Sequence, residues 1–210
     1  MLRTAFAAVF ACLPSWTLAL DQGLPELPSL SSITEKVFAQ SESLRVDMEV
    51  YGYFEGTRYD IRDTFNKIDL EASRESSGKD FRFSGTVDGR YLTGRVEAQN
   101  DGSWRIWGGG LSVDLRPRGA SGYEITGFVD EAEGSRHIDI DLRPSGAPGS
   151  FSVWESGMSI DVRKFGTTAD CSGDIRTDRF GRKSLAVLGV FIAVLESELD
   201  RPAPAPAQPK

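Results

Sequence analysis

The sequence predicts an all-β fold: a mainly antiparallel meander, arranged as a sandwich or an open or half barrel, with a short N-terminal helix and an apolar C-terminal helix. Three observations support this prediction. Apolar and polar residues alternate with a period of two through most of residues 44–165. Turn-forming residues interrupt the alternation about every 8–12 residues. A single continuous apolar run, residues 185–195, lies near the C-terminus.

The chain begins with the pattern of an export signal. In MLRTAFAAVFACLPSWTLAL, Arg3 precedes an apolar stretch, and small residues at Thr17 and Ala19 stand where a signal peptidase reads the chain. We therefore expect cleavage after Ala19, and a protein that is periplasmic or secreted.

This processing sets the expected domain limits. Residues 1–19 are the signal peptide, residues 20–200 form a single β-rich domain, and residues 201–210 form a Pro/Ala-rich disordered tail. The alternative is a protein that is lipid-anchored through Cys12. The bulky Phe10 makes VFAC a poor lipidation box, so cleavage is favoured.

A short amphipathic helix is expected from Ser31 or Ser32, as the capping residue, to about Gln40. Strands are then predicted at residues 44–54, 57–65, 66–73, 80–87, 90–98, 103–107, 111–116, 123–129, 137–143, 150–154 and 158–165. Asp88-Gly89 between two of them suits a type I′ hairpin, because both central residues of that turn need positive φ.

The segment DLRPRGA, which begins at Asp114, returns as DLRPSGA at Asp141 and more loosely as DVRKFGT at Asp161. Each copy ends an expected strand, with its apolar residues on one face and its Asp and Arg on the other. The spacing leaves room for one return strand between copies. We interpret the repeat as hairpin architecture that recurs on every other strand, in preference to a repeated ligand motif.

The apolar run Leu185–Leu195 is predicted to be a buried helix, with a central strand as the alternative because several of its residues are β-branched. As a helix the run spans about 16 Å, well short of the roughly 30 Å of a bilayer core. We therefore expect no transmembrane span.

Charge and composition exclude several classes of function. The formal net charge of −7 gives no basis for binding nucleic acid or an anionic membrane surface. The sequence holds one histidine and, after processing, one cysteine, which is too few for a His/Cys metal site. No glycine-rich phosphate loop precedes a helix. We expect no metal and no cofactor.

No catalytic residue is predicted. His137 would have to serve any Ser–His–acid site, with Asp139 as one candidate partner, but no GxSxG elbow is present. The acidic loop containing Asp130, Glu131 and Glu133 is interpreted as a solvated hairpin tip, and it lacks the spacing of a calcium loop. A carboxylate-based secreted hydrolase is the least favoured alternative, since carboxylate pairs meet in space and not in sequence.

The stretch NDGSWRIWGGGLS holds the strongest candidates for contact with a ligand or partner: Trp104, Arg105 and Trp107. A spacing of three places the two indoles on opposite faces of a strand, so one is expected in the core and the other outside. An outward Trp is a suitable anchor for a partner.

Cys171 is the only thiol expected after processing. Its polar, turn-forming neighbours in TADCSGD favour an exposed position. An exposed unpaired thiol in an oxidising compartment suggests a disulfide-linked dimer.

The order of these elements, and no motif, resembles the open half-barrels of periplasmic lipid and lipoprotein carriers. That resemblance implies an apolar cavity between the sheet and the helix, and the residues expected to line it are Val46, Val50, Phe81, Phe83, Val113 and Leu115. We therefore expect an exported, non-catalytic cell-envelope protein that binds an apolar small molecule or an envelope protein through its β-sheet. The alternative is a structural or interaction module of an envelope complex.

Overall fold

The computed structural model describes residues 42–53, 56–76, 78–119, 122–155 and 157–199. All of them belong to one compact unit, Ser41–Lys210. The expected signal peptide, the expected N-terminal helix and the Pro/Ala-rich tail lie outside the described residues.

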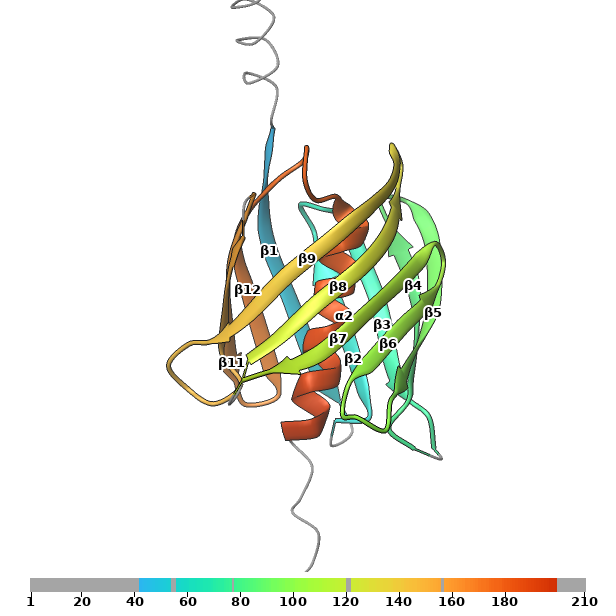
Figure 1. The fold of residues 1–210 in the computed structure, drawn as a ribbon, viewed down its shortest axis with the longest axis vertical. Helices are drawn as coiled ribbons and strands as arrows, with labels where there is room; N and C mark the ends of the chain where they lie inside the picture. The colour runs from blue at the N-terminus through green and yellow to red at the C-terminus, as the bar shows by residue number, and fades with distance from the viewer. Residues whose placement is uncertain (1–41, 54–55, 77, 120–121, 156, 200–210) are drawn as a thin grey trace, which may run out of the picture. The chain divides into compact units, whose positions relative to one another are not determined.

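The described residues form a closed barrel of twelve antiparallel strands (Figure 1). Each strand pairs with its neighbours in sequence, and β1 pairs with β12 to close the ring. The strands are β1 Ser43–Tyr53, β2 Arg58–Asp63, β3 Ile68–Arg74, β4 Phe81–Val87, β5 Arg90–Ala98, β6 Trp104–Gly108, β7 Leu111–Arg118, β8 Gly122–Glu131, β9 Gly134–Pro144, β10 Phe151–Glu155, β11 Met158–Phe165 and β12 Thr168–Arg176. The predicted antiparallel meander is confirmed. The sheet is a closed barrel, however, and neither a sandwich nor an open or half barrel.

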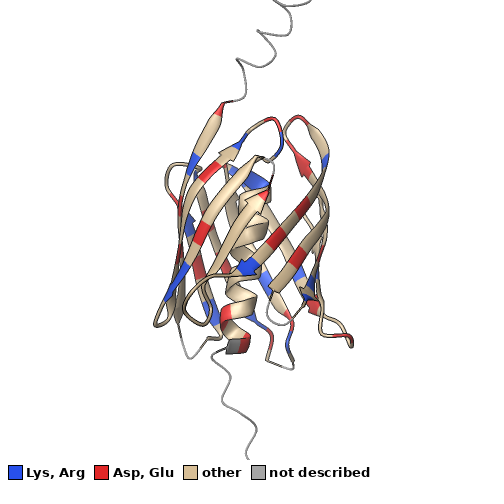
Figure 2. Cartoon of the chain, turned by 60° about the vertical axis from the view of Figure 1, so that its left-hand side comes forward, with Lys and Arg blue, Asp and Glu red and all other residues tan. Residues whose placement is uncertain are grey.

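Side chains alternate between the two faces of the barrel wall. In β1, for example, Val46, Met48 and Val50 are buried, while the residues between them are exposed. Figure 2 shows acidic and basic residues at intervals along the strands, and the burial pattern, as in β1, places them on the outer face. Because the sheet has no free edge, every wall strand has a neighbour on both sides for its backbone hydrogen bonds.

The repeated DLR segments lie in β7, β9 and β11, as the interpretation of hairpin architecture requires. Their apolar residues are buried, and their Asp and Arg residues form ion pairs on the outer face, such as Arg116 with Asp114 at 3.0 Å. Pairing includes both prolines: Pro117 stands opposite Tyr123 and Pro144 opposite Phe151. These strands therefore end later than the sequence suggests.

The apolar C-terminal run is a helix, α2 (Arg182–Leu199), which runs along the inside of the barrel (Figure 1). The predicted buried helix is confirmed and the alternative of a central strand is wrong. A closed ring offers no edge to a further strand, so a segment inside it must satisfy its backbone by itself, as a helix does. Among the described residues, no helix has both the length and the hydropathy that crossing a bilayer requires.

The helix and the inner face of the wall form one core. The residues that the sequence assigned to a ligand cavity are all at most 2% exposed, namely Val46, Val50, Phe81, Phe83, Val113 and Leu115. Helix residues such as Leu188 and Phe191 are fully buried among them. An eight-stranded barrel is filled by its own side chains, whereas a barrel of about 16–18 strands encloses a channel. A barrel of intermediate size has a lumen that suits a helix about 10–12 Å across. The helix therefore occupies the place that a ligand was expected to take.

Three inward-facing glycines lie four strands apart around the ring: Gly85 in β4, Gly127 in β8 and Gly173 in β12. Each has φ near +154° and stands opposite an apolar residue of the preceding strand. A Cβ at Gly127 would lie 2.2 Å from the carbonyl oxygen of Ser112, and the other two positions are equally tight. Glycine kinks of this kind bend a sheet, and here they divide the wall into three four-stranded parts.

We predict that Gly127→Ala destabilises the protein by about 1–3 kcal/mol, because the new methyl group requires a strained backbone and meets the Ser112 carbonyl. Urea unfolding at equilibrium measures this change. The control is Gly78→Ala, where the nearest atom to the new Cβ is 3.9 Å away. Equal free energies of unfolding for the two variants would contradict the role given to Gly127.

Candidate functional site

An aromatic row crosses the outer face of β6 to β9. Trp107 stands opposite Ser112, Ser112 opposite Phe128, and Phe128 opposite His137. Trp107 is 47% exposed and Phe128 is 56% exposed. The His137 ring lies edge-on to Phe128, with 5.1 Å between the ring centroids. We call Trp107, Ser112, Phe128 and His137 the Trp107 row.

The structure separates the two tryptophans as the sequence predicts. Trp104 is 8% exposed and belongs to the core, whereas Trp107 points outward. Arg105, between them, is also outward, and its Nε donates to Asp114 at 2.7 Å. That hydrogen bond lowers the pKa of the Asp114 carboxyl and raises the pKa of Arg105. Of the three predicted contact residues, Trp104 is buried and Arg105 would have to give up its ion pair with Asp114 to contact a partner. Trp107 points outward and has no such ion pair to break.

Phe128 is a contact candidate that the sequence analysis passed over, although the signal was present. In YEITGFV, burial of Ile125 and Val129 on one face requires Phe128 to be on the other. The sequence could not predict that Phe128 lies in the same row as Trp107, because their alignment depends on the register of β6, β7 and β8.

A second aromatic row lies at β11, β12 and β1. Phe165 stands opposite Thr168, and Thr168 opposite Tyr51. Tyr51 also packs against Tyr53, with ring centroids 4.5 Å apart. This Tyr51 row is centred on β12, five strands from β7 in a ring of twelve, so it lies almost opposite the Trp107 row. The Tyr51 row has the same arrangement as the Trp107 row, because in both an aromatic residue lies on each side of a small hydroxyl residue.

Cys171 does not lie at the surface. It is 0% exposed in β12, which the sequence analysis took for a turn, and its cross-strand neighbours are Met48 and Val162. The expectation of an exposed thiol is wrong, because small inward residues at Ala169, Cys171 and Gly173 hide the strand alternation. Burial raises the pKa of the Cys171 thiol well above its usual range. An intermolecular disulfide at this position finds no support.

At one end of the barrel, the tip of β8 caps the helix. The Glu131 carboxylate accepts hydrogen bonds from the Ser184 backbone N–H and hydroxyl, both at 2.9 Å, and from the Lys183 N–H at 3.3 Å. The absence of a side chain at Gly181 makes room, since a Cβ there would lie 2.3 Å from the Glu131 carboxyl carbon. The group that caps the start of α2 is thus Glu131, which belongs to a hairpin distant in the sequence.

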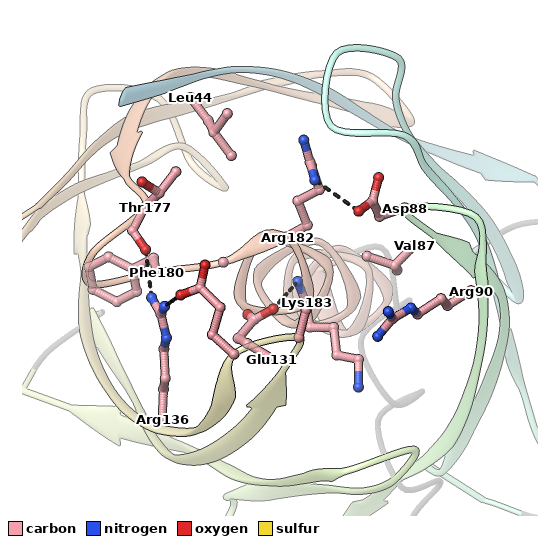
Figure 3. Close-up of a pocket in the computed structure, with 13 residues that line it drawn as sticks. Leu44, Val87, Asp88, Arg90, Glu131, Arg136, Thr177, Phe180, Arg182 and Lys183 are labelled. Atoms are coloured by element: carbon pink, nitrogen blue, oxygen red, sulfur yellow. Dashed lines mark hydrogen bonds and ion pairs between the residues drawn. The ribbon is translucent and has the colours of Figure 1, made fainter. Parts of the chain in front are cut away.

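The same end holds a pocket, the mouth pocket, with a volume of about 150 Å³ (Figure 3). Its lining combines apolar side chains, among them Val87 of β4 and Phe180, with charged side chains. The charged ones include Arg90 of β5, Glu131 of β8, Arg136 of β9, and Arg182 and Lys183 at the start of α2. Glu133 of the acidic loop also lines it and pairs with Arg136. The hairpin tip is exposed as the sequence predicted, at Asp130 and Glu133, whereas the Glu131 carboxylate is taken up by the helix N-terminus.

The opposite end fixes the helix C-terminus. The Arg74 guanidinium donates to the Ser197 hydroxyl and lies 3.4 Å from Glu198. Lys164 pairs with Glu196, which is buried. In the described part of the chain, no three His, Cys, Asp or Glu side chains gather in a way that suits a metal ion.

Comparison with known proteins found no match to a family model, to a curated protein or to a solved structure.

We predict that Glu131→Ala lowers the free energy of unfolding by about 1–2 kcal/mol, because the helix N-terminus loses its capping acceptor. Thermal and urea unfolding measure the loss. Glu133→Ala is the matched control: its carboxylate belongs to the same hairpin, is 77% exposed and does not touch the helix amides. A loss at position 133 as large as that at position 131 would contradict the capping role.

Cys171 should make stability fall in mild alkali. The folded state keeps the buried thiol protonated, whereas the unfolded thiol ionises near pH ~8.5. The unfolded state then binds fewer protons, so the free energy of unfolding decreases above that pH, by up to about 1.4 kcal/mol per pH unit. Urea unfolding between roughly pH 8 and 10 should show this extra slope in the wild type and not in Cys171→Ala. Identical slopes would mean that the thiol is not buried.

Proposed function

We propose that this protein is an exported, non-catalytic binding protein of the cell envelope, which holds a partner protein against the outer wall of its barrel. The export pattern of residues 1–19 supports the location. The filled interior supports the use of the outer wall, because α2 occupies the lumen where an apolar ligand was expected.

The observation that carries this proposal is the exposure of Trp107 and Phe128 in one row of a rigid sheet. Two strand spacings of about 4.8 Å separate their backbones, with only the small Ser112 between them. A partner side chain placed over Ser112 would touch both rings and remove apolar surface from water. Tryptophan at the centre of such a contact is the residue type most enriched among binding hot spots.

The surroundings of the row suit a specific contact. Arg95, opposite Trp107, is tied to Glu75 at 2.9 Å, and Arg105 is tied to Asp114. A partner bound over the two rings therefore buries the apolar centre. The paired charges stay at the rim of the contact, where they remain hydrated.

The test begins with a photo-crosslinking residue in place of Ser112, in cells of the source organism. The matched control places the same residue at Thr168, in the centre of the Tyr51 row. We expect a discrete adduct with a second protein from position 112 and none from position 168. Adducts from both positions, or from position 168 alone, would overturn the proposal. An adduct of the chain with itself would replace it with self-association.

For the partner so identified, we predict that Trp107→Ser with Phe128→Ser weakens binding by a factor of about 30–1000, the range for losing two anchor residues. Binding of the purified proteins, measured by calorimetry, gives this ratio. Tyr51→Ser with Phe165→Ser should leave the affinity within about threefold of the wild type. Equal losses for the two double variants would count against the Trp107 row.

A further inference from the structure

The lining of the mouth pocket holds four basic and three acidic side chains, and two of the basic ones have no carboxylate partner among the described residues. Arg182 pairs with Asp88 at 2.9 Å, and Arg136 pairs with Glu133. The Glu131 carboxylate is used by the helix N-terminus. Two cations remain, Arg90 and Lys183.

Neither of these cations has a carboxylate partner among the described residues. The Lys183 ammonium donates only to the Gly109 carbonyl, at 3.2 Å, and the described residues provide no hydrogen bond or ion pair to the Arg90 side chain. Figure 3 shows Arg90 and Lys183 reaching into the same side of the opening, one from the wall and one from the helix. Two cations directed at a common space attract an anion, the more so beside apolar surface.

Part of the lining is apolar. Val87 and Phe180 are 4% and 5% exposed, and with the partly buried Leu44 they line different sides of the opening, Val87 on the side of Arg90 (Figure 3). A volume of about 150 Å³ is that of a cavity that accepts benzene. The space therefore suits an apolar body of roughly six to eight carbon atoms, with one charged end at the opening.

We propose that the mouth pocket binds a small amphiphilic carboxylate, with the carboxylate between Arg90 and Lys183 and the alkyl body against Val87, which lies on the same side of the opening (Figure 3). This site does not depend on the Trp107 row, which lies on the outer wall. It also differs from the lumen cavity that the sequence suggested, because the ligand rests on the N-terminal end of α2 and does not replace the helix.

The probe is octanoate, which has the expected size, and octan-1-ol is its neutral counterpart. Titration of the full barrel, followed by amide chemical shifts, should give saturable changes at residues 87–90 and 181–183. We expect octan-1-ol to bind about tenfold more weakly, the factor for losing a charge-assisted hydrogen bond. No saturable change at the mouth, or equal binding of the alcohol, would overturn the proposal.

Arg90→Gln should weaken octanoate binding by about tenfold for the same reason. The matched control is Arg143→Gln, which removes the same charge from the outer wall in β9, outside the mouth pocket. It should leave octanoate binding unchanged. Because Arg90 is exposed, the unfolding transition of the variant should match that of the wild type. Equal losses of octanoate affinity in the two variants would show that the net charge of the protein alone attracts octanoate. The proposed site would then be wrong.

Discussion

The fold depends on the burial of one apolar helix inside a closed wall. The wall strands offer their apolar faces inward, and α2 is apolar on every side through its central part, so each requires the other. Figure 2 shows that charged residues of the helix are confined to its ends. At one end Arg182 pairs with Asp88 while Glu131 caps the first backbone amides, and at the other end Glu198 pairs with Arg74 and Glu196 with Lys164. The polar contacts fix the depth of the helix, and the apolar contacts hold it in place.

Closure of the wall follows from local features that recur around the ring. The glycines of β4, β8 and β12 bend the sheet at intervals of four strands, and the strand before each one carries an alternating apolar face. The segments FSGTV, ITGFV and CSGDI share this arrangement. Two copies of the DLR segment lie beside these glycines, because β7 precedes β8 and β11 precedes β12. The copy in β9 does not precede a strand with such a glycine. The threefold division is thus more regular in space than the repeat in sequence.

The filled interior leaves the outer wall and the ends of the barrel as the surfaces open to contact. Many outward residues of the strands are charged and paired with a residue of the same or a neighbouring strand, which gives them little to gain from a new contact. The Trp107 row and the mouth pocket differ from this background. The first leaves aromatic surface in water, and the second leaves two cations without carboxylates in the part of the chain that is described. The Trp107 row on the wall and the mouth pocket at the end of the barrel thus hold groups that could form further contacts.

The sequence by itself determined the strand faces, the Asp88-Gly89 turn, whose residues both have positive φ, the division of Trp104 from Trp107, and the buried helix at residues 185–195. Each of these follows from local periodicity or backbone preference. Only the tertiary structure decided that the sheet closes, that β12 is a strand around a buried Cys171, that Glu131 caps a helix about fifty residues later in the chain, and that Phe128 shares a row with Trp107. These depend on register and on contacts between distant segments, because a ring of strands has the same local pattern whether it is open or closed.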